Sequence, residues 1–244
     1  MKNIQVKANL EKLFKVNFDA VNSLSIETFF DQLIAEPVMA YDPSRDEFNG
    51  VFDEEEIEVL KEARQDSELL NAFKKVAELK FDDNQIIEGF KKDIVASLAE
   101  IRKNLKNNSF SNQIIFLEND FEPYAYFCGF GTGNYPILSE PDYFDYNFKE
   151  EIYNGVGKID YSVIWNDLLL LNDFLIELEI EDIINETEYF QNLLNALKFK
   201  TYLLLHDTFD QLGIEIFKDF KVENPLYIYA NEHDCEAMNV YVFE

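Results

Sequence analysis

Apolar residues in the first 110 positions recur with the spacing of amphipathic helices. Ser25 can cap the first helical segment, and Pro37 ends it. Asp53 starts the second segment, in which Glu54, Glu55 and Glu56 favour the positive end of the helix dipole. Gln65–Asp66 interrupts the second segment, so that this segment predicts either one helix or two. The pattern therefore predicts helices over residues 26–36, 53–79 and 83–106.

The pattern changes to that of β-strands beyond Asn112. Runs rich in β-branched and aromatic residues predict a hairpin over 113–130 and a second hairpin from 226–229 to 239–243. Residues 129–148 combine glycines, prolines, aromatics and acids, and predict an ordered irregular loop. Residues 161–181 are apolar on more than one face and predict a largely buried helix, and residues 186–217 predict one or two more helices with a break at Gly213.

These elements place the chain in the α+β class. We expect a helical N-terminal half packed with an antiparallel sheet, which hairpins of the C-terminal half build. A chain of 244 residues can bury a substantial core, so residues 1–244 are expected to form a single domain. Within it, residues 1–110 are the helical part and residues 111–244 are an acidic, tyrosine-rich α+β part.

Acidic residues greatly outnumber basic ones: 48 Asp and Glu stand against 21 Lys and Arg, a formal net charge of −27. Such a chain is a poor ligand for nucleic acid or an anionic membrane surface, because both require clustered Lys and Arg. The sequence has no N-terminal signal segment, no apolar run near the roughly 18 residues that span a bilayer, and too few cysteines for a disulfide framework. The expected location is therefore the cytoplasm.

The negative charge is concentrated in one part of the chain. Residues 1–110 carry 15 basic and 22 acidic residues, a net charge of −7, whereas residues 111–244 carry 6 and 26, a net charge of −20. Twelve of the 13 tyrosines also lie in the second part. Uncompensated like charges repel one another and weaken a fold. This concentration therefore indicates a surface for a cationic partner.

Two motifs that suggest phosphate binding or catalysis depart from the patterns they would need. Residues 129–134, GFGTGN, have Asn134 where a dinucleotide-binding loop requires glycine, and they lack the Gly-Lys-Ser/Thr of a P-loop. Close backbone packing or a turn is therefore favoured for these glycines. Cys128 with His206 or His233 would form a Cys–His pair, but Cys128 lies in a hydrophobic strand, where a thiol is usually inert.

A metal site is an alternative that the sequence leaves open. His206 and His233 are the two histidines, and each is followed by an aspartate, Asp207 and Asp234. Two histidines and a carboxylate can hold a catalytic metal. The competing interpretation is that His206 is a hydrogen-bonded core residue of a leucine-rich helix and that Asp234 forms a turn. No metal or other cofactor is expected under that interpretation, and a non-enzymatic protein is favoured.

Tyrosines and carboxylates alternate densely over residues 118–153, a segment of 36 residues with one lysine, Lys149. Tyrosine supplies rigid contact area, and carboxylates attract and pair with the Lys and Arg of a basic protein. The predicted partner-binding residues are Asp120, Glu122, Tyr124, Tyr126, Glu140, Asp142, Tyr143, Asp145 and Tyr146. The same segment contains Glu118, Tyr135, Glu150, Glu151 and Tyr153.

Two stretches, FEPYAYFCGFGTGNYPILSEPDYFDYNF and LYIYANEHDCEAMNVYVFE, resemble bacterial immunity proteins that neutralise basic toxins of polymorphic toxin systems. The resemblance lies in composition and general architecture. It implies a cytoplasmic inhibitor without enzymatic activity, whose acidic surface masks the toxin residues that contact RNA or DNA. The alternatives are a metal-dependent hydrolase that uses His206, His233 and nearby carboxylates, and a structural accessory subunit.

Overall fold

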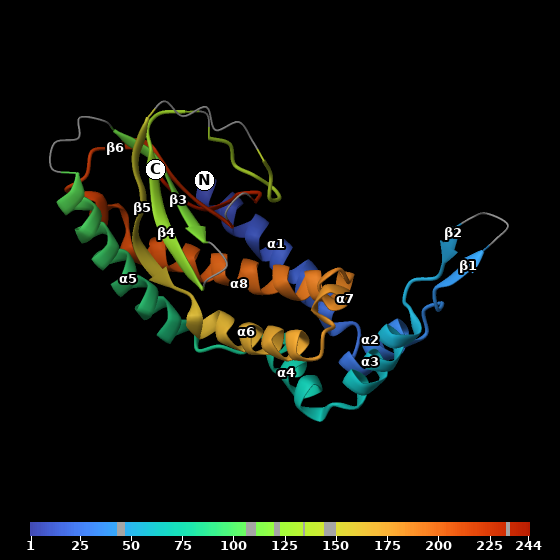
Figure 1. The fold of residues 1–244 in the computed structure, drawn as a ribbon. Helices are drawn as coiled ribbons and strands as arrows, with labels where there is room; N and C mark the ends of the chain where they lie inside the picture. The colour runs from blue at the N-terminus through green and yellow to red at the C-terminus, as the bar shows by residue number, and fades with distance from the viewer. Residues whose placement is uncertain (43–46, 106–110, 120–122, 134, 144–149, 233–234) are drawn as a thin grey trace. The chain divides into compact units, whose positions relative to one another are not determined.

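The computed structural model describes residues 1–42, 47–105, 111–119, 123–133, 135–143, 150–232 and 235–244 (Figure 1). The chain divides into two compact units. The first, which we call the sheet unit, comprises Met1–Phe14, Phe81–Trp165 and Lys198–Glu244. The second, the helical unit, comprises Lys15–Lys80 and Asn166–Leu197. Each unit therefore contains residues from both sides of position 110.

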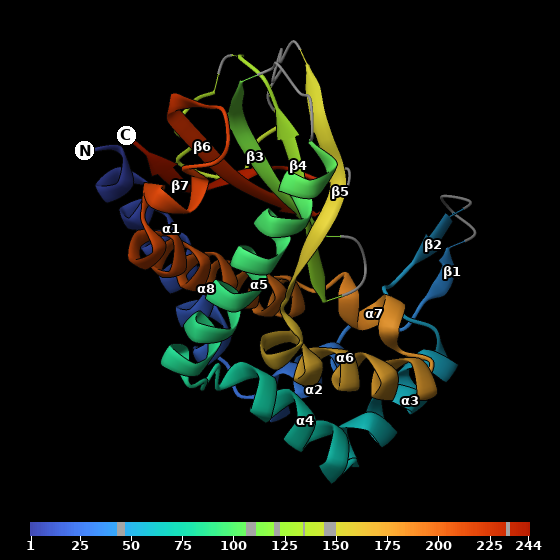
Figure 2. The same cartoon turned by 90° about the vertical axis from the view of Figure 1, so that its left-hand side faces the viewer.

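The sheet unit is built around a five-stranded sheet of order β5-β4-β3-β6-β7 among the described residues (Figure 2). The strands are β3 (Asn112–Asn119), β4 (Tyr124–Phe130), β5 (Glu151–Asp160), β6 (Val222–Glu232) and β7 (Met238–Phe243). Both predicted hairpins and the α+β class are confirmed. The sheet is mixed rather than antiparallel, because β6 follows a series of helices and pairs with β3 in the parallel direction.

Most of the helical structure of the sheet unit comes from the first part of α1 (Lys2–Asn22), from α5 (Asp83–Asn104) and from the second part of α8 (Glu188–Leu212). Helix α5 lies against β5, and the Ser97 hydroxyl donates to the Lys158 carbonyl (3.0 Å) and accepts from the Lys158 N–H (2.9 Å). A Cβ at Gly157 would lie 2.4 Å from the Ser97 Cβ. The helix can therefore approach β5 closely only because residue 157 is glycine.

Helix α8 ends where the sequence predicts. Gly213 has φ +68°, a left-handed conformation that favours glycine, and the short 3₁₀ helix η1 (Ile214–Phe217) follows. None of the helices in the described residues combines the length and the apolar character needed to cross a membrane.

The helical unit contains α2 (Ile26–Ile34), α3 (Glu54–Gln65), α4 (Ser67–Ala77), α7 (Glu181–Asn185) and most of α6 (Ser162–Glu177). It also contains a two-stranded ribbon of β1 (Ala40–Asp42) and β2 (Glu47–Asn49). The predicted cap at Ser25 is confirmed, since its hydroxyl accepts from the Thr28 N–H. Asp53 caps α3 and forms a reciprocal capping box with Glu56. Asp66 ends α3 and caps α4, so the second predicted helix is two helices.

Aromatic rings fill the core of the helical unit. Phe30 and Phe73 are fully buried and meet edge to face, with ring centroids 5.8 Å apart. Phe73 also packs edge to face on Phe190, and Phe29 stacks on Tyr189 with centroids 4.6 Å apart.

The expectation that residues 161–181 form a largely buried helix is wrong in part. Leu168, Leu171 and Leu175 of α6 are buried at helical spacing. Leu170 and Ile176, in contrast, are 56% and 50% exposed. A run of four leucines cannot face one direction on a helix, because successive side chains point about 100° apart.

Candidate functional site

The strand register brings the described part of the predicted binding surface to one end of the sheet. Tyr124 pairs with Asp160 of β5, and Tyr126 pairs with Glu118 of β3. On the other side of β3, Glu118 pairs with Asn231 and Asn119 with Glu232. We call this the acidic end of the sheet, defined by Glu118, Tyr124, Tyr126, Glu140, Asp142, Tyr143, Asp160, Glu232 and Glu236.

The loop after β4 reaches this end because buried side chains hold its backbone. The Asn239 side chain accepts from the Leu138 N–H (2.6 Å) and donates to the Pro136 carbonyl (3.2 Å). Asn9 of α1 donates to the Leu138 carbonyl (2.7 Å), and the Tyr229 hydroxyl also donates to Pro136. The predicted ordered loop is therefore confirmed for residues 131–133 and 135–143.

A two-bond bridge fixes the position of Asp142. Its backbone N–H donates to the Ala237 carbonyl (3.1 Å) and its carbonyl accepts from the Ala237 N–H (3.2 Å). Ala237 directly precedes β7, at the same end of the sheet as Tyr124. Glu140 and Asp142 are exposed there, and Tyr143 is 63% exposed.

The charge at this end is almost wholly negative. Lys158 is the only Lys or Arg within the five strands, and three of the strands' acidic residues lie at this end: Glu118, Asp160 and Glu232. The Lys158 ammonium lies 4.1 Å from the centroid of the Tyr124 ring, a cation–π contact. The half-buried Tyr124 ring thus already accommodates a lysine side chain from its own chain.

Not all predicted residues can be placed, and some acids were missed. Asp120, Glu122, Asp145 and Tyr146 lie outside the described residues. Asp160, Glu232 and Glu236 were not predicted, because only the strand pairing brings them to this end. The sequence offered one signal for these acids, the alternation of apolar and polar residues along the predicted strands. This alternation does not show which strands pair when they are distant in sequence.

Two tyrosines of the 118–153 segment belong to the core and not to a surface. Tyr153 and Tyr135 are each 7% exposed. The Tyr153 hydroxyl accepts a hydrogen bond from the buried Asn112 side chain (2.9 Å), and the Tyr135 hydroxyl donates to the Gly131 carbonyl. Burial raises the pKa of both phenols.

The glycines of residues 129–134 allow close packing, as the sequence favoured. A Cβ at Gly129 would lie 2.2 Å from the Tyr153 Cζ, and a Cβ at Gly131 would lie 2.3 Å from the Glu150 carboxylate. A carboxylate beside this segment would repel phosphate. Cys128, on the preceding position, is buried, and its thiol donates to the Asn154 side chain (3.1 Å). Burial raises the pKa of this thiol to about 11, so it is not poised as a nucleophile.

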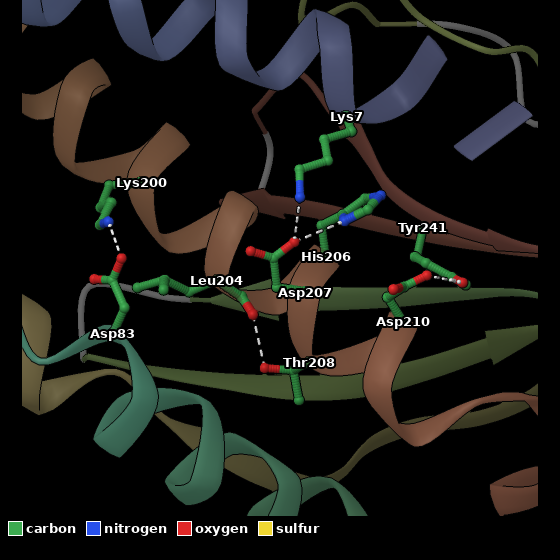
Figure 3. Close-up of polar contacts among 9 residues, drawn as sticks. All are labelled: Lys7, Asp83, Lys200, Leu204, His206, Asp207, Thr208, Asp210 and Tyr241. Carbon is green, nitrogen blue, oxygen red and sulfur yellow. Dashed lines mark hydrogen bonds and ion pairs between the residues drawn. The ribbon is translucent and has the colours of Figure 1, made fainter. Parts of the chain in front are cut away.

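His206 lies in a polar cluster of the sheet unit that joins α1, α8 and β7 (Figure 3). Its Nδ1 is 3.3 Å from an Asp207 oxygen, which also accepts from the Lys7 ammonium at 2.7 Å. The imidazole meets the Tyr241 ring edge to face, with centroids 5.1 Å apart. The Tyr241 hydroxyl in turn donates to Asp210 (3.0 Å).

Burial of this cluster favours the neutral form of the His206 imidazole. His206 is 4% exposed, and burial lowers its pKa, although Asp207 opposes this effect through its hydrogen bond and charge. The Nε2 atom is buried and has no hydrogen-bond partner among the described residues. His233 and Asp234 lie outside the described residues, so the predicted pairing of the two histidines is not placed. Within the described residues, no three His, Cys, Asp or Glu side chains are grouped to hold a metal ion.

No family model, curated protein or solved structure matches this chain. A function for this chain must therefore be inferred from the acidic end of the sheet and from the surroundings of Cys128 and His206. The acidic end can attract and pair with cationic groups, whereas Cys128 and His206 are buried and hydrogen-bonded within their own unit.

Proposed function

We propose that this chain is a non-enzymatic cytoplasmic protein that binds and neutralises a basic protein toxin, as immunity proteins do. The observation that carries the proposal is the strand register, which gathers Tyr124, Tyr126 and the surrounding carboxylates at one end of the sheet. Segments that are far apart in the sequence contribute to this end. A cationic surface of matching extent would contact all of them at once.

Charge and tyrosine serve different purposes in such a complex. Carboxylates accelerate the encounter with a cationic partner and pair with its Lys and Arg. Tyrosines provide contact area with few rotatable bonds to restrict. The lysine already seated on the Tyr124 ring illustrates the type of contact, since a partner's lysine or arginine would find a similar ring at Tyr143.

The loop that carries Glu140 and Asp142 is ordered by contacts within this chain, without a partner. Asn9 and Asn239 fix its backbone from two different elements, and the bridge to Ala237 fixes its end. A surface that is already ordered loses less conformational freedom on binding, which favours the tight association that an inhibitor of a toxin requires.

The test uses the protein encoded beside this gene, because a toxin gene normally lies next to its immunity gene. Association is measured by biolayer interferometry between 50 and 500 mM NaCl, with the double reversal Glu140→Lys/Asp142→Lys beside the unchanged protein. We expect the association rate to fall by about tenfold or more with the reversal and steeply with salt. Glu100→Lys, a reversal at an exposed acid of α5, is the control and should change the rate far less.

Two results would contradict the proposal: an association rate indifferent to salt and to the reversal, or co-expression that fails to protect cells from the neighbouring protein. A stable complex with a neutral protein that ignores both variants would favour the structural accessory subunit instead.

One observation favours metal-dependent hydrolysis as a second candidate. A metal-bound histidine commonly offers one ring nitrogen to the metal while a carboxylate contacts the other nitrogen. His206 has Asp207 beside Nδ1 and no described partner at Nε2. Metal analysis of the purified protein decides between the two functions. Stoichiometric zinc, manganese or iron that is lost in His206→Ala and in His233→Ala would favour the hydrolase. Purified protein that contains no metal would exclude the metal-dependent hydrolase.

A further inference from the structure

Helix α6, whose course is drawn in Figure 1, exposes apolar side chains in the helical unit. Leu169, Leu170 and Ile176 are 37%, 56% and 50% exposed, although the same helix buries Leu168, Leu171 and Leu175 on its other side. Asp173 and Glu177 are exposed between them. Spacings of three, four and seven residues place these five side chains on one face over about two turns. We call Leu169, Leu170, Asp173, Ile176 and Glu177 the α6 face.

The two acids of the α6 face have no ion-pair partner among the described residues, unlike Asp167 of the same helix. Asp167 forms an ion pair with Lys75 of α4 at 2.7 Å. Asp173 and Glu177 form no ion pair with any described residue. The sequence on both sides of the α6 face supplies no cation either, because residues 159–197 contain nine acidic residues and no Lys or Arg. The α6 face therefore combines exposed leucine and isoleucine with uncompensated negative charge.

This combination identifies the chemistry of what would cover the face. Exposed aliphatic side chains in a contiguous patch are typical of interaction surfaces. A second copy of this chain would bring Asp173 and Glu177 against the same acids, and each copy carries a net charge of −27. A partner must instead supply apolar side chains together with Lys or Arg. An amphipathic helix with lysines beside its apolar stripe does this at matching spacing, because ridges of one helix fit the grooves of another.

We propose that the α6 face binds a cationic amphipathic helix of the basic partner. Apolar side chains of that helix would cover Leu170 and Ile176, and its Lys or Arg would pair with Asp173 and Glu177. The inference rests on the proposed function, because the basic partner supplies the helix. It adds a second contact surface in the helical unit, which buries aliphatic side chains where the acidic end buries tyrosine rings.

The test uses a fluorescent 18-residue synthetic helix of Leu, Ala and Lys with its lysines on one face, titrated into the full chain. Leu170→Ser/Ile176→Ser keeps the charge and removes apolar surface, and we expect it to weaken binding by about tenfold or more. Val95→Ser/Ile214→Ser makes the same kind of change at side chains that are 51% and 42% exposed in the sheet unit. This control should leave the affinity within about twofold.

A second pair of variants tests the charges with little risk to folding. Asp173→Asn/Glu177→Gln should weaken binding of the peptide by about threefold to tenfold at 50 mM NaCl, and by less at 500 mM. Glu36→Gln/Glu62→Gln removes two other exposed acids of the helical unit and should have a smaller effect. Hydrogen exchange should show peptide-dependent protection of α6.

The outcomes separate this inference from the proposed function. Equal weakening by test and control variants, protection elsewhere than α6, or a dimer of this chain that Leu170→Ser/Ile176→Ser dissolves would each overturn it. If Glu140→Lys/Asp142→Lys slows association with the neighbouring toxin while Leu170→Ser/Ile176→Ser has no effect on it, the α6 face is not used and the proposed function stands. If the reversal has no effect on the toxin but the peptide binds α6 as expected, the proposed function falls.

Discussion

The Asn239 side chain in β7 accepts a hydrogen bond from the backbone N–H of Leu138, 101 positions earlier in the chain. Both residues are buried, and the amide of Asn239 also donates to the Pro136 carbonyl. The strand that ends the sheet on one side thus determines the course of the loop that carries Glu140 and Asp142.

Asn239→Ala should loosen this loop. The substitution leaves the buried Leu138 N–H without its partner, which lowers the free energy of unfolding by about 1–3 kcal/mol. Urea denaturation measures the loss, and hydrogen exchange should become faster at the backbone amides of residues 137–140 and 142. Asn166→Ala, at an exposed asparagine, is the control and should change stability by about 0.5 kcal/mol or less. Unchanged exchange at Leu138 would show that the other contacts hold the loop without Asn239.

Alanine at Gly129 and at Gly89 should change stability in opposite directions. A Cβ at Gly129 would meet the buried Tyr153 ring at 2.2 Å, and displacing that ring should destabilise the protein by about 1–3 kcal/mol. Gly89 lies within α5 and a Cβ there would meet no atom within 4 Å, so Gly89→Ala should stabilise by up to about 1 kcal/mol. Thermal and urea unfolding measure both. A neutral Gly129→Ala would mean that Tyr153 is not fixed by its bond to Asn112.

His206 should make the folded state sensitive to mild acid. Burial holds its pKa below the ordinary value of about 6.5, so the unfolded chain takes up the proton first as the pH falls. The free energy of unfolding therefore decreases below about pH 6.5 until the folded pKa is reached, and His206 contributes no such slope above about pH 7.5. Urea denaturation at several pH values should show the decrease in the unchanged protein and a smaller one in His206→Gln.

The neighbours of His206 provide a direct check by NMR titration of its ring. The Lys7 charge lowers the pKa of His206 and Asp207 raises it. Lys7→Met should therefore shift the titration to higher pH, and Asp207→Asn should shift it to lower pH. Shifts in the same direction for both variants would contradict this arrangement of charges.

The two thiols should react at very different rates. Cys128 is buried and burial raises its pKa to about 11, whereas Cys235 is half-buried. At pH 8 the folded protein should show one faster thiol toward a disulfide reagent, and Cys235→Ser should abolish that phase. Cys128 should react only in denaturant. Rapid labelling of Cys128 in the folded Cys235→Ser protein would contradict its burial.

Local signals in the sequence account for the elements that were predicted correctly. Ser25, Asp53 and Asp66 satisfy the first N–H groups of their own helices, so their effect does not depend on the rest of the fold. The same holds for Gly213, where α8 ends. Hairpin partners are also close in sequence, so alternating apolar residues were sufficient to predict β3 with β4 and β6 with β7.

The remaining features depend on contacts between distant segments. Strand β5 contains two glycines with positive φ, Gly155 and Gly157, and its pairing with β4 is irregular, so it has no clear alternation. Helix α1 has no proline or glycine to mark its ends. For the candidate site, Glu140 and Asp142 could be proposed from composition, but Asp160 and Glu232 join them only through the register of strands that are distant in sequence.

The parallel pairing of β3 with β6 has a consequence for how the protein is made. Strand β3 is central in the sheet, yet its second neighbour, β6, leaves the ribosome only after α6, α7 and α8 have been synthesised. Until then β3 has one open edge, and four successive apolar residues, Ile114 to Leu117, lie along it. Open apolar edges promote aggregation. The nascent chain is therefore prone to aggregation while more than 100 residues are synthesised between β3 and β6. We expect chains that stall before β6 to require chaperones or to be degraded.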